Sequence, residues 1–249
     1  MSGHSKWATT KHKKGAKDAA RAKSFAKLIR QVEVAAREGG GDINSNATLR
    51  TMFAKARDSS VPLDTIERAI KRGTGELEGV RYEAITYEGY APGGVAVIVE
   101  TLTDNRNRTS AEVRHLFSKN GGSMAEPGAV SWQFERRGVI VVDRAADEDA
   151  LMEAVMEVGG EDLADDGTQW TVTCEATDTH AVKVGLEVAG FTVVSAEPSL
   201  VPSQTVPVAE QGEAIKLLRL LDAIDDHDDV QAVHANADIP NAILEAYEG

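Results

Sequence analysis

The sequence has little cysteine and no long apolar stretch. Cys174 is the single cysteine among 249 residues, so no internal disulfide can form. A lone cysteine flanked by apolar and threonine residues is typically a small buried hydrophobe. No window approaches the ~18 apolar residues that a membrane-spanning helix needs, and the basic start MSGHSKW lacks the apolar segment of a signal peptide. With 42% hydrophobic residues to build a core, these features predict a soluble cytoplasmic protein that does not contact membranes.

Motifs of catalysis and cofactor binding are missing as well. The chain contains no GxSxG, HExxH or Cys-His arrangement, no phosphate-binding loop and no GxGxxG. The acidic run Asp225–Asp229 does not have the spacing of an EF-hand, and it favours a solvated turn before a strand. The histidines show no metal-ligand spacing. We therefore expect no enzyme activity, no metal, no cofactor and no small-molecule substrate.

The net charge of −13 hides a strong segregation of charge along the chain. Residues 1–37 hold ten Lys and Arg against two acidic residues, whereas residues 138–249 hold four against 24. Residues 81–137 carry equal numbers of both signs. A basic block at one end of an otherwise acidic chain is typical of an arm that binds nucleic acid.

This basic block supplies the first set of candidate contacts. Lys and Arg bind a polyanion by displacing its counterions, and an aromatic ring stacks on unpaired bases. Residues 1–16 show no apolar period and predict an arm without regular structure when free, whereas the later cations lie on the polar side of a predicted helix. The candidates are Lys6, Trp7, Lys11, His12, Lys13, Lys14, Lys17, Arg21, Lys23, Lys27 and Arg30. The alternative is a solvated charged helix face.

The run Thr103–Thr109 supplies the second set, which consists of Asn105, Arg106, Asn107 and Arg108. The run leaves a predicted strand and enters a predicted helix, whose first N–H groups and dipole favour an anion. The arginines are suited to clamp a phosphate and the asparagines to hydrogen-bond a base or sugar. The alternative is a capping turn whose arginines pair with Asp104 or Glu112.

The periodicity of the first 75 residues predicts a small helical domain. Apolar residues from Phe25 to Ala36 recur with the period of a helix over 17–38, which ends at three glycines. Two more helices are expected over 46–58 and 62–75, the second with an acidic capping box at Asp64 and Glu67.

After residue 80 the pattern becomes that of strands and helices. Strands are expected at 82–90, 95–102 and 130–134, with a helix that runs to Lys119 and is capped by Thr109 and Glu112. The glycine-rich segment 121–128 is suited either to approach a nucleic-acid backbone closely or to form a plain surface loop.

Residues 138–206 predict the order βαββαβ, which is ferredoxin-like. A segment with Pro198, Pro202 and Pro207 predicts a linker, and a helix over 210–224 and a strand over 230–235 follow.

The elements before residue 138 cannot cover a sheet by themselves, because they comprise three strands and one helix. The final helix and strand supply the missing pieces. The sequence therefore predicts an α+β protein with a basic arm and helical domain at 1–80 and a split α+β domain at 81–137 plus 207–249. The acidic ferredoxin-like domain, 138–206, is inserted into the split domain.

Several motifs occur together in the order known from one family. They are Gly3–Trp7, Phe25–Arg30, Ala35–Arg37, Gly39–Asp42, Ile66–Gly75, Tyr87–Gly94, Thr103–Thr109 and Gly128–Trp132. The chain resembles the YebC/PmpR family, which includes the mitochondrial translational activator of cytochrome c oxidase. It departs from the family at Ser59–Pro62, where members often carry Asn-Met before the proline.

This resemblance implies a three-domain, non-enzymatic protein. Some members are named DNA-binding transcriptional regulators, and others help ribosomes through difficult stretches such as consecutive prolines. Carried over by position, the implied nucleic-acid contacts are Lys6, Trp7, Lys11, His12, Lys13, Lys14, Asn105, Arg106, Asn107 and Arg108.

Three hypotheses about function follow. The first is a DNA-binding transcriptional regulator, which family naming favours. The second is a ribosome-associated factor that contacts ribosomal RNA, with the acidic body facing basic ribosomal proteins; the Lys-rich arm favours it, because Lys makes point-charge contacts with phosphate rather than bidentate contacts with bases. The third is a protein-interaction module that uses its acidic body to bind a basic partner.

Overall fold

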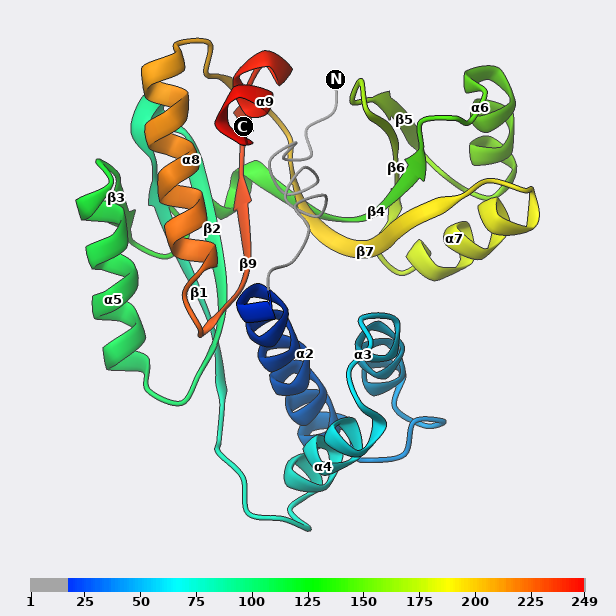
Figure 1. Ribbon diagram of the computed structural model, residues 1–249, viewed down its shortest axis with the longest axis vertical. Helices are drawn as coiled ribbons and strands as arrows, with labels where there is room; N and C mark the ends of the chain where they lie inside the picture. Colours follow the sequence, from blue (N-terminus) through cyan, green and yellow to red (C-terminus); the bar gives the residue numbers. More distant parts are fainter. Residues whose placement is uncertain (1–17, 249) are drawn as a thin grey trace.

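The computed structural model describes residues 18–248, and these form one helical part followed by two parts built on sheets (Figure 1). The helices of the first part are α2 (Asp18–Gly39), α3 (Ala47–Asp58) and α4 (Leu63–Thr74). The apolar stripe of α2 is buried, with Val32 and Ala36 at its centre, and packs against the other two helices. Gly73 makes this close packing possible, because a Cβ there would lie 2.4 Å from the carbonyl oxygen of Glu33.

The caps of these helices differ from the one that the sequence predicts. Asn46 caps α3, and its side chain accepts a hydrogen bond from the N–H of Leu49. The predicted capping box at Asp64 is wrong, because α4 begins at Leu63 after Pro62 without a side-chain cap. Pro62 takes the N-cap position, where its ring fixes φ and its carbonyl oxygen accepts the N–H groups of Thr65 and Ile66 at 3.0 and 3.2 Å.

The second part is a four-stranded sheet with two helices on one face. Its elements are β1 (Glu83–Tyr90), β2 (Ala96–Thr103), α5 (Arg106–Lys119), β3 (Ser123–Ala125), α8 (Gln211–Asp225) and β9 (Val230–Ala235). The strand order is β3-β1-β2-β9, and neighbouring strands are antiparallel. Helices α5 and α8 lie side by side over this sheet (Figure 1), and their apolar residues share one core with it. Strand β9 therefore completes the sheet, and α8 covers it, more than 120 residues after β1 begins.

The third part has the predicted ferredoxin-like topology. Its elements are β4 (Phe134–Asp143), α6 (Glu148–Glu157), β5 (Asp162–Asp165), β6 (Gln169–Glu175), α7 (Thr179–Val188) and β7 (Val193–Pro202). The strand order β5-β6-β4-β7 is the one a βαββαβ unit adopts when both crossovers are helical. The predicted α+β class, with this unit inserted into the split part, is confirmed. The exact domain limits stay predictions, since β4 runs without a break across residues 137 and 138.

Two local predictions in this region are wrong. The expected strand at 130–134 is a 3-10 turn, Ser131–Gln133, and the strand of this region is β3 instead. The proline segment is not a linker, because Pro198 and Pro202 lie within β7. Strand β7 is an edge strand, where a residue without an N–H is tolerated.

The remaining elements are a short pair of strands and a final helix, which the sequence pattern does not predict. Pro207 ends the short strand β8 (Val206–Pro207), which pairs with β10 (Ala237–Asp238). The final helix α9 (Asn241–Glu248) was not expected. Within the described residues, no helix combines the length and apolar content needed to cross a membrane. Cys174 is fully buried as predicted, and burial raises the pKa of its thiol.

Candidate nucleic-acid interface

The structure separates the predicted contact residues into three groups. Lys6, Trp7, Lys11, His12, Lys13, Lys14 and Lys17 lie outside the described residues, and Arg21 lies in α2 with its side chain outside the description. Lys23, Lys27 and Arg30 occupy one side of α2. Asn105, Arg106, Asn107 and Arg108 lie at the start of α5. The acidic turn Asp225–Asp229, between α8 and β9, joins the last two groups.

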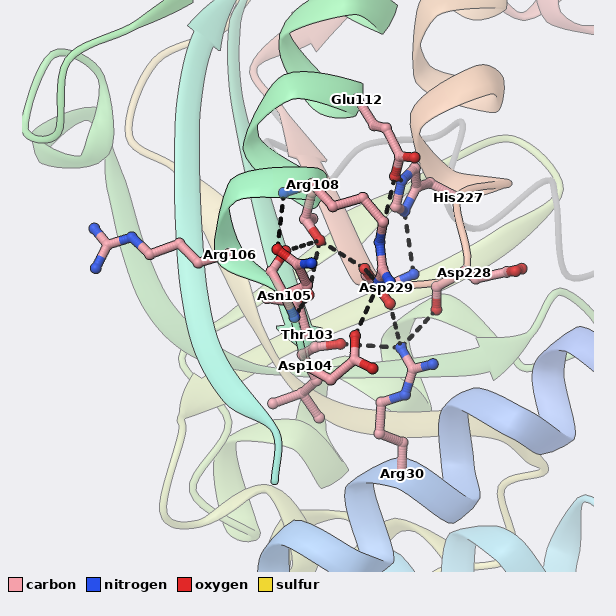
Figure 2. Close-up of polar contacts among 12 residues, drawn as sticks. Arg30, Thr103, Asp104, Asn105, Arg106, Arg108, Glu112, His227, Asp228 and Asp229 are labelled. Carbon is pink, nitrogen blue, oxygen red and sulfur yellow. Dashed lines mark hydrogen bonds and ion pairs between the residues drawn. The ribbon is translucent and has the colours of Figure 1, made fainter. Parts of the chain in front are cut away.

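Asp229 is the centre of this junction (Figure 2). One carboxylate oxygen, Oδ1, accepts a hydrogen bond from Arg30 at 3.1 Å, and Oδ2 accepts from Arg108 at 2.8 Å and from the Thr109 hydroxyl at 2.6 Å. The residue is only 3% exposed. Burial alone would raise the pKa of Asp229, but hydrogen bonds from Thr109 and Arg108 and the charge of Arg108 outweigh burial and lower it. An ionised carboxylate therefore ties α2 to α5.

Arg30 reaches from α2 into the second part of the molecule. Its Nη1 atom also donates to the carbonyl oxygens of Leu102 and Asp228, each at 2.9 Å. The guanidinium lies 4.9 Å from the centre of the Tyr82 ring, in cation–π contact. With these partners Arg30 joins two parts of the fold, and contact with a phosphate would require it to exchange them.

The other two α2 cations contact the same acidic turn. Lys23 donates to the carbonyl oxygen of Asp226 at 3.1 Å, and Lys27 donates to that of Asp225 at 2.7 Å. The spacing of Lys23, Lys27 and Arg30 places them on one face of α2. The turn precedes β9 as predicted, but it is a docking element for α2 rather than a freely solvated turn.

The start of α5 differs from the prediction. Asn105, not Thr109, is the N-cap, and its Oδ1 accepts the N–H of Arg108 at 3.1 Å. The Thr109 hydroxyl is instead buried and bonded to Asp229. Arg108 pairs with Asp104 at 2.9 Å, so the capping-turn alternative holds for this arginine. Arg106 is exposed and points away from the cluster (Figure 2).

A shallow groove follows the outer face of α5 beyond Asn107. It is lined by Asn107, Ser110, Ala111, Arg114, His115 and Ser118. Apart from alanine, each of these side chains can donate a hydrogen bond, and none is acidic. Sequence reasoning missed Arg114 and His115, although they stand seven and eight residues after Asn107, on the same side of a helix.

Asn105 caps α5 and Asn107 does not, so substitution of the two asparagines should affect stability differently. Replacing Asn105 with Ala removes the bond to the N–H of Arg108 and is expected to lower the free energy of unfolding by about 1 kcal/mol. Asn107→Ala is the control, because Asn107 is exposed within the helix; its effect should stay within about 0.5 kcal/mol. Urea unfolding followed by circular dichroism measures both. Equal losses in the two variants would show that Asn105 is not the cap.

Metal binding receives no support from the geometry. Among residues 18–248, no group of three or more His, Cys, Asp or Glu side chains is placed to hold a metal ion. The junction around Asp229 is instead composed of paired cations and carboxylates.

Fold and junction together define a class of protein: a helical part carrying cations, docked on a split α+β part that contains an inserted ferredoxin-like unit. The chain belongs to the TACO1/YebC family. The model of the family's N-terminal domain matches residues 5–76, and that of its second and third domain matches residues 82–237.

Relatives and a solved structure agree with this assignment. A "probable transcriptional regulatory protein" of Thermobifida fusca is 55% identical over 246 residues, covering 98% of both chains. One of Acidithiobacillus ferrooxidans is 54% identical over 239 residues, covering 96% of this chain and 95% of its own. The crystal structure of a conserved hypothetical protein, Aq1575, from Aquifex aeolicus is 44% identical with a TM-score of 0.82, covering 90% of this chain and 93% of its own.

Proposed function

We propose that this chain is a cytoplasmic, non-enzymatic regulator of gene expression that binds nucleic acid, and specifically a DNA-binding transcriptional regulator. The observation that carries the proposal is the segregation of charge, with ten cations against two acids in residues 1–37 of a chain whose net charge is −13. The names of the relatives, probable transcriptional regulatory proteins, support the transcriptional role.

The α2 contacts support the same proposal from the chemistry of the surface. Lys23, Lys27 and Arg30 already bind the carboxylates and carbonyl oxygens of the acidic turn. Phosphate oxygens are acceptors of the same kind, so this face is suited to a polyanion that displaces the turn.

The predicted contacts divide into two roles in this proposal. The arm residues, the α2 cations, Arg106 and Asn107 contact the nucleic acid, and Arg114 and His115 extend that surface along α5. Asn105 and Arg108 hold the loop in position, because their side chains are bonded within the chain.

The second candidate is a ribosome-associated translation factor that contacts ribosomal RNA. Lysines supply seven of the nine cations in residues 1–30, which suits phosphate contact without base reading. The excess of acidic residues in 138–249 suits basic ribosomal proteins.

Crosslinking in cells, followed by sequencing of the bound nucleic acid, tests these roles. Enrichment of promoter DNA would support transcriptional regulation, and enrichment of ribosomal RNA would support the ribosomal role. Enrichment of neither would reject both and leave a protein-interaction module.

A further inference from the structure

Trp132 is exposed although its ring is large and apolar. It lies in the 3-10 turn Ser131–Gln133 and is 75% exposed, whereas Trp170 is 2% exposed. The Nε1–H of Trp132 donates to the carbonyl oxygen of Ala129 at 3.1 Å. Because the polar atom is satisfied within the chain, the ring offers a partner its flat apolar face.

A buried carboxylate fixes the loop that presents this ring. Glu88 is 6% exposed and accepts the N–H groups of Gly128 and Val130 at 2.7 Å and of Ser131 at 2.9 Å. Burial raises the pKa of Glu88, but these three N–H groups outweigh burial and lower it. The loop is therefore ordered before any partner binds, which reduces the entropy lost on binding.

A second aromatic residue shares the anchor. The hydroxyl of Tyr90, at the end of β1, donates to the same Ala129 carbonyl oxygen at 3.2 Å. Tyr90 is also exposed, at 38%. The polar ends of two exposed aromatic side chains therefore converge on one backbone atom.

The surroundings of Trp132 indicate what binds there. Within the described residues, Tyr90 is the one other exposed large hydrophobic side chain bonded to this loop; the rest belong to other elements and connections: Leu63, Leu77, Val80, Met152, Met156, Val184, Val188 and Val194. A protein interface has a contiguous apolar centre, which the Trp132 loop does not provide. An unpaired nucleobase needs one open ring, and stacking on it is largely independent of base identity.

We propose that Trp132 is a stacking platform for an unpaired nucleobase. This inference rests on the proposed function and deepens it, because it assigns the chain a preference for nucleic acid that exposes single-stranded bases. Glu88 acts as a positioning residue that holds the loop, and Tyr90 flanks the platform.

The test compares Trp132→Ala with the unchanged protein on two single strands at one low salt concentration. One strand carries thymine bases, and the other has the same length and charge but is abasic. Trp132→Ala should weaken binding to the thymine strand about tenfold and leave binding to the abasic strand unchanged. Trp132→Phe keeps an aromatic face and should restore most of the lost affinity. Thermal unfolding of both variants should match the unchanged protein, since the ring is exposed.

Two results would overturn the platform and leave the proposed function standing: undiminished binding of Trp132→Ala to the thymine strand, or an equal loss on both strands. If the unchanged protein binds neither strand nor duplex DNA, the proposed function fails and the platform fails with it. The two failures are therefore distinguishable.

Discussion

Replacing Asp229 with Ala is expected to lower the free energy of unfolding by about 3 kcal/mol, because it removes one partner of a buried ion pair. The substitution leaves Arg30, whose side chain is 16% exposed, without its carboxylate. It also leaves the buried Thr109 hydroxyl without its shortest hydrogen bond. The docking of α2 on the second part should weaken together with the start of α5.

Asp228→Ala is the matched control for this prediction. The Asp228 side chain is exposed, and its contact with Arg30 is made by the backbone oxygen, which the substitution keeps. Urea unfolding should place this variant within about 0.5 kcal/mol of the unchanged protein. A similar loss in both variants would contradict the central role of Asp229.

Lowering the pH should reproduce part of the destabilisation that we expect for Asp229→Ala. The folded-state pKa of Asp229 is lowered, so the unfolded chain takes up the proton first as pH falls. The contribution of Asp229 to stability is complete above about pH 4, the ordinary range of an aspartate, and is lost as pH falls through the folded-state pKa. Between about pH 6 and pH 3, the free energy of unfolding should therefore fall less in Asp229→Ala than in the unchanged protein.

Salt is expected to have the largest effect on binding. If about five cations contact phosphates of duplex DNA, raising the salt concentration from about 50 to about 200 mM should lower the affinity roughly five hundredfold. Deleting residues 1–17 removes five lysines, and the slope of log affinity against log salt should fall by about four to five. Fluorescence anisotropy with a labelled duplex measures both quantities.

Lys216→Ala is the control for the arm deletion, since Lys216 lies on α8 in the acidic part of the sequence. Its salt slope should match that of the unchanged protein. A flat salt response in the unchanged protein would reject phosphate contact altogether. Undiminished binding after deletion of residues 1–17 would remove the arm from the proposed interface.

The N-cap of α5 could not be predicted from the sequence, because two residues near its start can cap a helix. Asn105 and Thr109 are both good N-caps, and nothing in the residues around them distinguishes the two. The choice is made by Asp229, 120 residues after Thr109, because it takes the Thr109 hydroxyl. Residues 130–134 failed as a strand for a similar reason, since Glu88, 42 residues before Val130, binds the N–H groups that a strand would use.

The helices and strands with a clear period, the βαββαβ order and the concentration of cations at one end could all be predicted from the amino-acid sequence. It also predicted the return of the last helix and strand, because an uncovered sheet needs them. The packing of distant segments was needed to show that Arg30 and Arg108 share Asp229, that Arg106 is exposed and that Trp132 is exposed on its loop. These outcomes depend on residues far apart in the chain, whose pairing is fixed by packing and not by the neighbours of each residue.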